Sequence, residues 1–192
     1  SFASNLNALK FSPNFKATIN KKSFKAYLIN NYVNNQETFY EGVENVEPGS
    51  LLIFENNRII KKKYFDIKKY FKKPKKYEKF NVSEFDEILR KSVETRLISD
   101  VDVGVFLSGG IDSSIISAIA KQHNNKIKSF TLGFEEESYD ETSNAKIVSK
   151  YLNIENETYI LKKNDLLEIE KVVNSFGEPL ADTSIIPTYF LS

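Results

Sequence analysis

From residue 103 onward the sequence alternates between short apolar stretches of strand length and longer stretches with helical spacing, and this alternation restricts the fold more than any other feature. Strands are predicted over residues 103–107, 127–132 and 157–161, and helices over about 112–122, 141–152 and 165–175. A helix with an apolar face is predicted before them, over 82–97 with Asn81 or Ser83 as its cap, and another begins within the final "IIPTYFLS". Repeated strand–helix–strand order is typical of a parallel sheet with helices on its faces, because parallel strands need long crossover connections. The second part of the chain is therefore predicted to be an α/β domain.

The residues before this pattern predict antiparallel structure instead. One helix is expected where Phe24, Tyr27, Leu28 and Tyr32 recur at helical spacing. A Pro48-Gly49 turn, a strand over 51–54, an Asn56-Asn57 turn and a returning strand predict a β-hairpin. The stretch from 61 to 80 is rich in lysine and contains Pro74, which is typical of a connection between domains. We therefore predict two domains, at residues 1–73 and 74–192.

The most informative motif is the turn "LSGGIDSS", which directly follows the first predicted strand of the α/β part. Ligands of open parallel sheets bind at the carboxyl ends of the strands, and the loop after the first strand commonly meets phosphate. Gly109 and Gly110 lack Cβ atoms and let the backbone approach a ligand. The helix that begins near Asp112 presents free N–H groups to an anion, and Ser108, Ser113 and Ser114 add hydroxyl donors. The turn is therefore predicted to bind phosphate.

Common phosphate and nucleophile motifs do not fit this turn. A Walker A loop needs a lysine that is absent, a dinucleotide fingerprint needs glycines at a different spacing, and a nucleophile elbow needs G-x-S-x-G. Asp112 would repel a polyphosphate unless a cation lay between them, so Mg²⁺ bound to Asp112 is predicted. The alternative, that Asp112 only caps its helix, stays open. Asp140 and Glu141 are predicted to be exposed caps of the following helix.

The composition excludes several kinds of site and partner. With 27 Lys and Arg against 26 Asp and Glu, the net charge is +1, so no overall field attracts nucleic acid or a membrane. The absence of cysteine excludes disulfides and a cysteine nucleophile within these 192 residues. No apolar run approaches the roughly 20 residues that span a bilayer, so a soluble cytoplasmic protein is expected. The absence of methionine indicates a processed chain or a piece of a longer one.

These motifs resemble a known family. "SGGIDSS" is similar to the pyrophosphate loop of the ATP-pyrophosphatases, and "RLISDVDVGVFLSGGIDSSIISAIA" resembles glutamine-hydrolysing asparagine synthetases of type B. Downstream, "SFTLGFEEESYDETSNAKIVSKYL" and "GEPLADTSIIPTYFLS" follow in the order expected of that family, and upstream "SFASNLNAL" and "YEGVENVEPGSLLIF" resemble the end of its glutaminase domain. The resemblance implies the following fold class: an α/β parallel-sheet ATP-pyrophosphatase (adenine nucleotide alpha hydrolase-like) domain, preceded by the antiparallel C-terminal part of an N-terminal-nucleophile glutaminase domain.

The resemblance also implies site residues. Residues that would hold the β- and γ-phosphates of ATP are Ser108, Gly109, Gly110, Asp112 and Ser113, with Asp112 reaching Mg²⁺. Leu107 and Leu132 match positions that receive the adenine through backbone groups. The acceptor carboxylate of the family binds near Asp182, Thr183 and Ser184. Many members of the family read Asp-Glu-Pro where this chain has Gly177-Glu178-Pro179, so the chain departs from the family close to the acceptor site. No catalytic residue is assigned.

The function implied is an ATP-dependent ligase that makes asparagine from aspartate, glutamine and ATP through an aspartyl-adenylate, releasing AMP and pyrophosphate. The chain is expected to be an inactive fragment of that enzyme, and a homodimer stays open. One alternative is a related amidotransferase that acts on another carboxylate in surface-polysaccharide or secondary metabolism. The lysines and aromatic residues of 61–79 suggest a second, a tRNA-modifying ATP-pyrophosphatase, but a solvated linker without nucleic acid is favoured. A binding domain without catalysis is the third.

Overall fold

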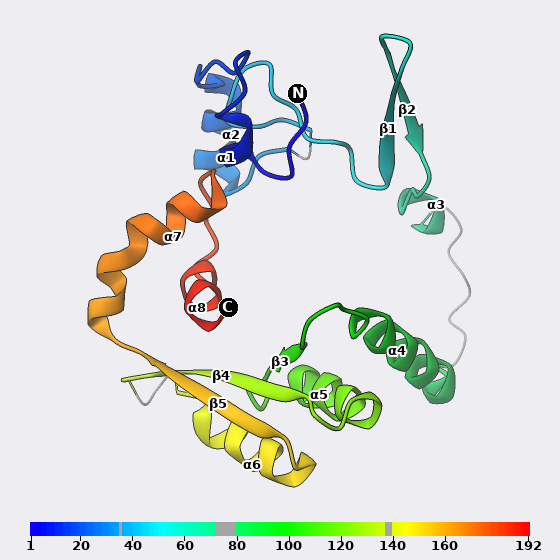
Figure 1. Cartoon of the computed structure of the whole chain (residues 1–192), viewed down its shortest axis with the longest axis vertical. Helices are drawn as coiled ribbons and strands as arrows, with labels where there is room; N and C mark the ends of the chain where they lie inside the picture. The colour runs from blue at the N-terminus through cyan, green and yellow to red at the C-terminus, as the bar shows by residue number, and fades with distance from the viewer. Residues whose placement is uncertain (35, 72–79, 137–139) are drawn as a thin grey trace. The chain divides into compact units, whose positions relative to one another are not determined.

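The structure is a computed structural model that describes residues 1–34, 36–71, 80–136 and 140–192. The chain forms two compact units (Figure 1). The first unit comprises Ser1–Glu78 together with Lys171–Asp182, and the second comprises Lys79–Glu170 together with Thr183–Ser192. The domain boundary predicted at 73/74 lies outside the described residues. Unlike the two predicted domains, the first compact unit includes a segment from late in the chain.

The first unit contains short helices and one hairpin. Its elements are α1 (Leu6–Leu9), α2 (Lys21–Asn30), β1 (Ser50–Glu55), β2 (Arg58–Lys63), α3 (Lys68–Phe71) and most of α7 (Ile169–Phe176). Helix α2 begins where the Asn20 side chain accepts hydrogen bonds from the N–H groups of Lys22 and Ser23 at 3.1 and 3.2 Å. It ends at Asn31, whose φ of 63° is left-handed. The predicted helix is therefore confirmed, although Tyr32 lies beyond its end.

The predicted hairpin is also confirmed. Strands β1 and β2 pair antiparallel from Ser50↔Lys63 to Glu55↔Arg58. The two turn residues, Asn56 and Asn57, have φ values of 49° and 60°, as a two-residue turn that matches the strand twist requires. Lys61 and Lys63 project to the same side of β2 and form ion pairs with Glu47 at 2.7 and 2.6 Å. These two lysines of the basic stretch are therefore partnered within the first unit.

Helix α7 joins the first unit through contacts with the N-terminal residues. The Asn7 side chain donates a hydrogen bond to the carbonyl oxygen of Asn174 at 2.6 Å. Gly177 ends the helix with φ +81°, and a Cβ built on it would lie 3.0 Å from the Asn7 side chain. The sequence predicts one helix over 165–175, but the structure has a 3-10 helix at Lys163–Glu168 followed by α7.

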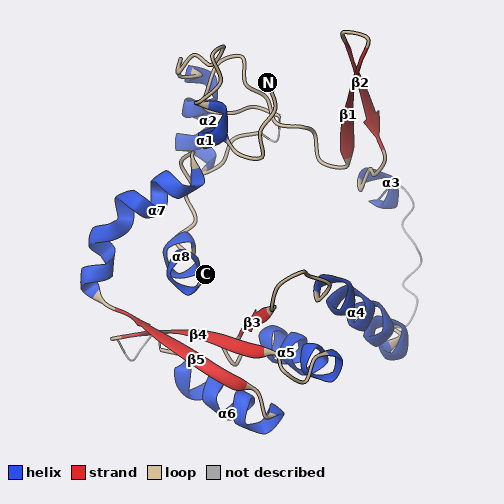
Figure 2. Cartoon of the chain, in the orientation of Figure 1, coloured by secondary structure: helices blue, strands red, loops and turns tan. Residues whose placement is uncertain are grey.

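The second unit contains a parallel sheet of three strands, in the order β3-β4-β5 (Figure 2). Strands β3 (Gly104–Phe106), β4 (Lys128–Phe134) and β5 (Glu155–Leu161) alternate with helices α5 (Ile111–His123) and α6 (Thr142–Leu152). Buried and half-buried residues alternate along β4, so one side of the strand is more deeply covered than the other. Helices α5 and α6 lie on one side of the strands and α8 (Ile185–Leu191) on the other. The predicted parallel α/β arrangement is therefore confirmed.

The core of the second unit lies between α4 (Val82–Arg96), α5 and the sheet. It consists of Val93, Val105, Ile119, Ala120, Ile127 and Ile154, with Leu89, Leu97 and Leu152 packed against them. Asn81 caps α4, as predicted, through hydrogen bonds to Ser83 N and Glu84 N at 3.1 and 3.2 Å. Only part of the predicted apolar face of α4 is covered, since Val82, Phe85 and Ile88 are exposed.

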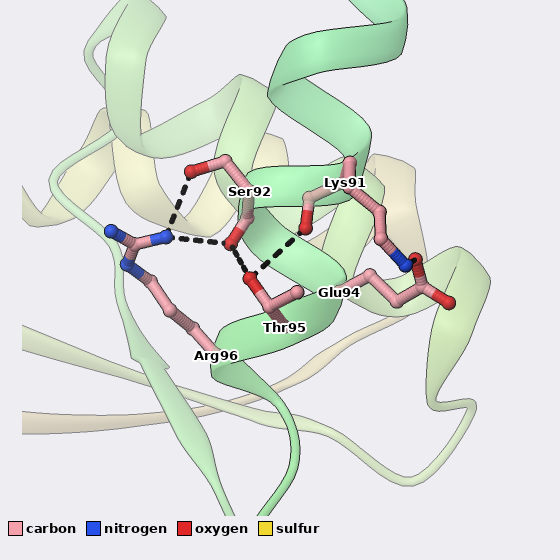
Figure 3. A network of polar contacts seen from close by, with 5 residues as sticks. All are labelled: Lys91, Ser92, Glu94, Thr95 and Arg96. Atoms are coloured by element: carbon pink, nitrogen blue, oxygen red, sulfur yellow. Dashed lines mark hydrogen bonds and ion pairs between the residues drawn. The ribbon is translucent and has the colours of Figure 1, made fainter.

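Helix α4 ends in a network of polar contacts (Figure 3). The Arg96 guanidinium donates to the carbonyl and hydroxyl oxygens of Ser92, both at 2.8 Å, and the Thr95 hydroxyl lies within hydrogen-bonding distance of the carbonyls of Lys91 and Ser92. Lys91 and Glu94 form an ion pair at 2.9 Å. A guanidinium on the final carbonyl groups also complements the negative end of the helix dipole. This end of α4 leads into the segment before β3.

Candidate functional site

The predicted phosphate-binding turn joins the end of β3 to the start of α5. Gly110 takes the N-cap position with φ −69° and ψ 164°, and no described side chain makes a cap hydrogen bond there. The first N–H groups of an α-helix have no partner within the helix. Since no side chain satisfies them, they and the positive end of the helix dipole remain available to an anion.

Two serine hydroxyls hold the turn in shape. Ser108 Oγ and Ser113 Oγ lie 3.0 Å apart, and Ser113 Oγ also donates to the Gly110 carbonyl oxygen at 3.2 Å. The N–H of Ser108 donates to Ser113 Oγ, and the N–H of Gly110 donates to Ser108 Oγ, both at 3.3 Å. The Ser108 hydroxyl can donate to Ser113 Oγ, so both hydroxyl hydrogens are then engaged in hydrogen bonds within the turn. A phosphate would therefore meet the backbone N–H groups first, and a hydroxyl would have to rotate to reach it.

Gly109 brings the turn into contact with the next helix. Its φ of +84° is left-handed, and a Cβ built on it would lie 2.6 Å from Ala145 N and 2.6 Å from the carbonyl carbon of Asn144. Both atoms belong to the backbone of α6. Only glycine fits this position, because it alone combines the backbone angle with the close approach. The shape of the turn therefore depends on α6 as well as on its own sequence.

Asp112 is exposed in the first turn of α5. Gly110 is the N-cap, and within the described ranges no hydrogen bond or ion pair involves the Asp112 carboxylate. The alternative that Asp112 caps its helix is therefore wrong. Among all residues that the structure describes, no group of three or more His, Asp or Glu side chains could bind a metal ion. Since Mg²⁺ usually keeps several waters and binds through one or two carboxylates plus phosphates, a single free Asp112 beside a phosphate site fits this ion.

Leu107 lies at the entrance to the turn and is 2% exposed. Its N–H donates to the Phe130 carbonyl at 2.9 Å, and its own carbonyl accepts from Thr131 Oγ1 at 2.8 Å. Leu132 pairs with Tyr159 of β5 and is half-buried. The Leu107 N–H is occupied, so a base would have to use the second lone pair of its carbonyl. An adenine contact at Leu107 and Leu132 stays a prediction.

A buried polar network behind Leu107 was missed in the sequence. Thr131, 1% exposed, also lies 2.9 Å from Asn156 Oδ1, and Ser129, which is fully buried, donates to the same oxygen at 2.9 Å. This network connects β5 to the carbonyl that opens the turn. Its only signal in the sequence is a pair of hydroxyl residues spaced by two in an otherwise apolar strand, "SFTLGF".

Asp140 lies at the start of α6. Its carboxylate accepts hydrogen bonds from Thr142 N at 3.3 Å and from Thr142 Oγ1 at 2.7 Å. The Thr142 hydroxyl bond lowers the pKa of Asp140, against an opposing effect of burial, with further lowering from the backbone of Thr142 and Phe134 and from Lys146. The predicted capping role of Asp140 is confirmed, but the residue is half-buried rather than exposed. Glu141 is exposed and occupies the N-cap position of α6, as predicted, but its side chain makes no cap hydrogen bond.

The predicted acceptor residues lie in an exposed segment before α8. Asp182 belongs to the first compact unit, and Thr183 and Ser184 belong to the second. Ser184 is the N-cap residue of α8, and its carbonyl accepts from Thr188 Oγ1 at 2.7 Å. The role of these three residues in binding the acceptor stays a prediction.

Glu178 lies in a cavity of the first unit. The cavity has a volume of about 430 Å³, and Glu37, Asn45, Phe39 and Pro179 also line it. Partial burial raises the pKa of Glu178. The structure therefore places the Glu178 side chain among residues of the first compact unit.

Two family models match the chain. Residues 84–192 match the model of asparagine synthase, and residues 1–65 match the model of a glutamine amidotransferase domain. Together with the parallel sheet and the antiparallel hairpin, these matches confirm the predicted fold class. They also confirm the resemblance to glutamine-hydrolysing asparagine synthetases.

Several known proteins are similar to this chain over part of their own length. Glutamine-hydrolysing asparagine synthetase 1 of Bacillus subtilis is 36% identical over 193 residues, which is 100% of this chain and 30% of that protein. Asparagine synthetase 3 of the same organism is 26% identical over 143 residues, covering 70% of this chain and 23% of that protein. Amidase chry2 of Gibberella zeae is 36% identical over 141 residues, covering 62% of this chain and 20% of that protein. The chain thus spans a third or less of the length of these relatives, and it belongs to the asparagine synthase family.

Proposed function

We propose that this chain is the part of an ATP-dependent, amide-forming ligase that binds the polyphosphate of ATP. The observation that carries the proposal is the combination, among the described residues, of a helix start at Gly110 without a side-chain cap and an exposed Asp112 beside it without a polar partner. An uncapped helix start attracts an anion, and a carboxylate at the same place requires a cation between the two. Mg-ATP supplies both. Bound Mg²⁺ would neutralise charge on the phosphates.

In this proposal the residues of the turn bind and orient the leaving group. The N–H groups at the start of α5 would hold phosphate oxygens, and Gly109 and Gly110 let the backbone come close enough to do so. An oxygen of the acceptor carboxylate would attack the α-phosphorus, pyrophosphate would leave, and ammonia would then displace AMP from the acyl-adenylate. We propose aspartate as the acceptor and glutamine as the source of ammonia. The match of residues 1–65 to a glutamine amidotransferase domain supports the nitrogen source.

A second candidate keeps the same chemistry and changes the acceptor. Gly177 has a left-handed backbone and packs against Asn7, and the resemblance to the family implies aspartate at this position in many of its members. This departure, close to the predicted acceptor residues, supports a related amidotransferase that acts on another carboxylate. Pyrophosphate release measured with aspartate, glutamate and larger carboxylates separates the two candidates, since only asparagine synthesis requires aspartate as the best acceptor.

The remaining predicted properties extend the same proposal. We propose a soluble, cytoplasmic protein that binds small molecules and no nucleic acid, and a homodimer stays open. In the described ranges, no helix has both the length and the apolar character needed to cross a bilayer. The basic stretch that suggested a tRNA-modifying enzyme is described only to residue 71, and two of its lysines pair with Glu47. We also propose the domain division at 73/74, which lies between the two matched regions.

Asp112→Ala is expected to weaken Mg-ATP binding at least tenfold and to remove its dependence on Mg²⁺, because the carboxylate is the group in the turn that requires a cation. The measurement is calorimetry on the full-length protein with and without Mg²⁺. Asp102→Ala is the matched control, since Asp102 is an exposed carboxylate that precedes β3 and thus lies at the opposite end of that strand. Unchanged binding in Asp112→Ala would contradict the proposal and favour a binding domain without catalysis.

A further inference from the structure

Asp140 lies where the end of β4 meets the start of α6. Its carboxylate accepts hydrogen bonds from the N–H and the hydroxyl of Thr142, the first residue of α6. The backbone of Phe134, the last residue of β4, helps to lower the pKa of Asp140, so the carboxylate also faces the end of β4. Gly133 permits this contact, because a Cβ on it would lie 2.5 Å from Thr142 Cγ2 and 2.9 Å from Asp140 Oδ1. The end of β4 and the start of α6 are therefore held together by one half-buried carboxylate.

The next residues of α6 form the surface on which the phosphate-binding turn rests. Gly109 approaches the backbone of Asn144 and Ala145 so closely that its missing Cβ would lie 2.6 Å from both. These two residues lie two and three positions after Thr142 in the same helix. A small shift of the start of α6 would therefore move the backbone against which Gly109 packs, since close-packed contacts transmit displacements.

We propose that Asp140 is a positioning residue for the phosphate-binding turn. It fixes the start of α6 against β4, and α6 in turn fixes the left-handed conformation of Gly109. Asp140 acts through the backbone of α6 and does not contact the phosphate or the metal. The effect on the turn follows from the contacts alone, and only its consequence for Mg-ATP rests on the proposed function.

Asparagine at position 140 separates positioning from a direct role of the charge. An asparagine side chain still accepts the N–H at a helix start and can exchange a hydrogen bond with the Thr142 hydroxyl, but it carries no charge for a cation. Asp140→Asn is therefore expected to retain Mg-ATP affinity within about twofold, whereas Asp140→Ala loses about fivefold. Glu141→Ala is the matched control, because Glu141 is the adjacent carboxylate and makes no cap bond.

The experiment combines hydrogen exchange of the full-length protein without ligand and calorimetry with Mg-ATP. Asp140→Ala is expected to speed exchange in peptides covering 108–114 and 142–146, while Asp140→Asn and Glu141→Ala match the wild type. If Asp140→Ala does not fold, Thr142→Val provides the test instead. It removes only the hydroxyl donor and should speed exchange in the same peptides to a smaller extent. Unchanged exchange at 108–114 in both Asp140→Ala and Thr142→Val would overturn the inference. The inference would also be overturned if Asp140→Asn lost as much Mg-ATP affinity as Asp140→Ala while its hydrogen exchange stayed normal. The charge of Asp140 would then act directly on the bound Mg-ATP.

The two proposals fail in different ways. The exchange measurement contains no nucleotide, so it tests the positioning role even if the turn binds another anion. Faster exchange at 108–114 in Asp140→Ala, in a protein that shows no binding of Mg-ATP, would support positioning and contradict the proposed function. Normal exchange in a protein that binds Mg-ATP through Asp112 would do the reverse.

Discussion

Replacing Gly109 with alanine should destabilise the second unit by about 2–5 kcal/mol and abolish measurable Mg-ATP binding. The left-handed conformation costs an L-residue about 1–2 kcal/mol, and a side chain forced into a packed contact typically adds about 1–3 kcal/mol. Both apply here, since φ is +84° and the new Cβ would lie 2.6 Å from backbone atoms of α6. Backbone atoms cannot rotate away as a flexible side chain can, so the turn itself must move. Urea unfolding and calorimetry on the full-length protein measure the two effects.

Two other glycines serve as controls for this prediction. Gly110→Ala tests the same turn without strain, because the φ of Gly110 is −69° and the new Cβ would lie 3.4 Å from its neighbour Ser108 Oγ. Gly42→Ala tests the backbone angle without a collision, because its φ is +72° and no atom of the described residues lies within 4 Å of its Cβ position. We expect a small effect on stability in the first and only the cost of the dihedral angle in the second. A Gly109→Ala protein no less stable than Gly42→Ala would show that α6 yields to the turn.

Thr131→Val is expected to cost about 1–3 kcal/mol of unfolding free energy, because it keeps the shape of the side chain and removes a buried donor. The carbonyl of Leu107 and the amide oxygen of Asn156 would both lose the Thr131 hydroxyl, at 2.8 and 2.9 Å. Since the Leu107 carbonyl opens the phosphate-binding turn, weaker Mg-ATP binding should accompany the lower stability. Urea unfolding of the full-length protein provides the measurement.

Thr131→Ser is the companion variant for this network. It keeps the hydroxyl and removes a methyl group, so we expect it to retain Mg-ATP affinity even where packing is lost. A valine variant as stable as the wild type would mean that the hydroxyl network contributes no net stability, as can happen when a polar group is replaced by an apolar group of the same shape. Loss of affinity in the serine variant as well would mean that the methyl group of Thr131 supports the turn in addition to its hydroxyl.

The elements of the second unit could be predicted because each has a local signal. The strands and helices between residues 104 and 161 differ from the predicted ranges by only a few residues at their ends, and Asn81 begins α4 as its position indicates. The 3-10 helix before α7 was missed, because its residues have ordinary helical composition. The exposure of Phe85 and Ile88 was also unforeseen, since periodicity identifies a face and does not show what covers it.

The parts of the site that depend on neighbouring residues in the sequence could be predicted, whereas the contacts between distant elements could not. The turn at 108–113 follows from glycine, serine and aspartate within six positions, which is a short-range pattern. The contact of Gly109 with Ala145 and the bond of Thr131 to Leu107, 24 residues apart, join different elements and have no local signature. The capping alternative for Asp112 could be rejected only from the structure, because aspartate is common at helix starts whether or not it accepts a cap bond.

The contact of Gly109 with the α6 backbone means that the phosphate-binding turn cannot be transferred to another protein as a short motif. A seven-residue graft of Ser108–Ser114 into another strand–turn–helix scaffold would carry the serine hydrogen bonds and the helix start with it. It would leave behind the helix backbone that holds Gly109 in its left-handed conformation. A working transplant would therefore have to include β4 and α6, so the smallest transferable piece is two consecutive strand–helix units rather than one loop.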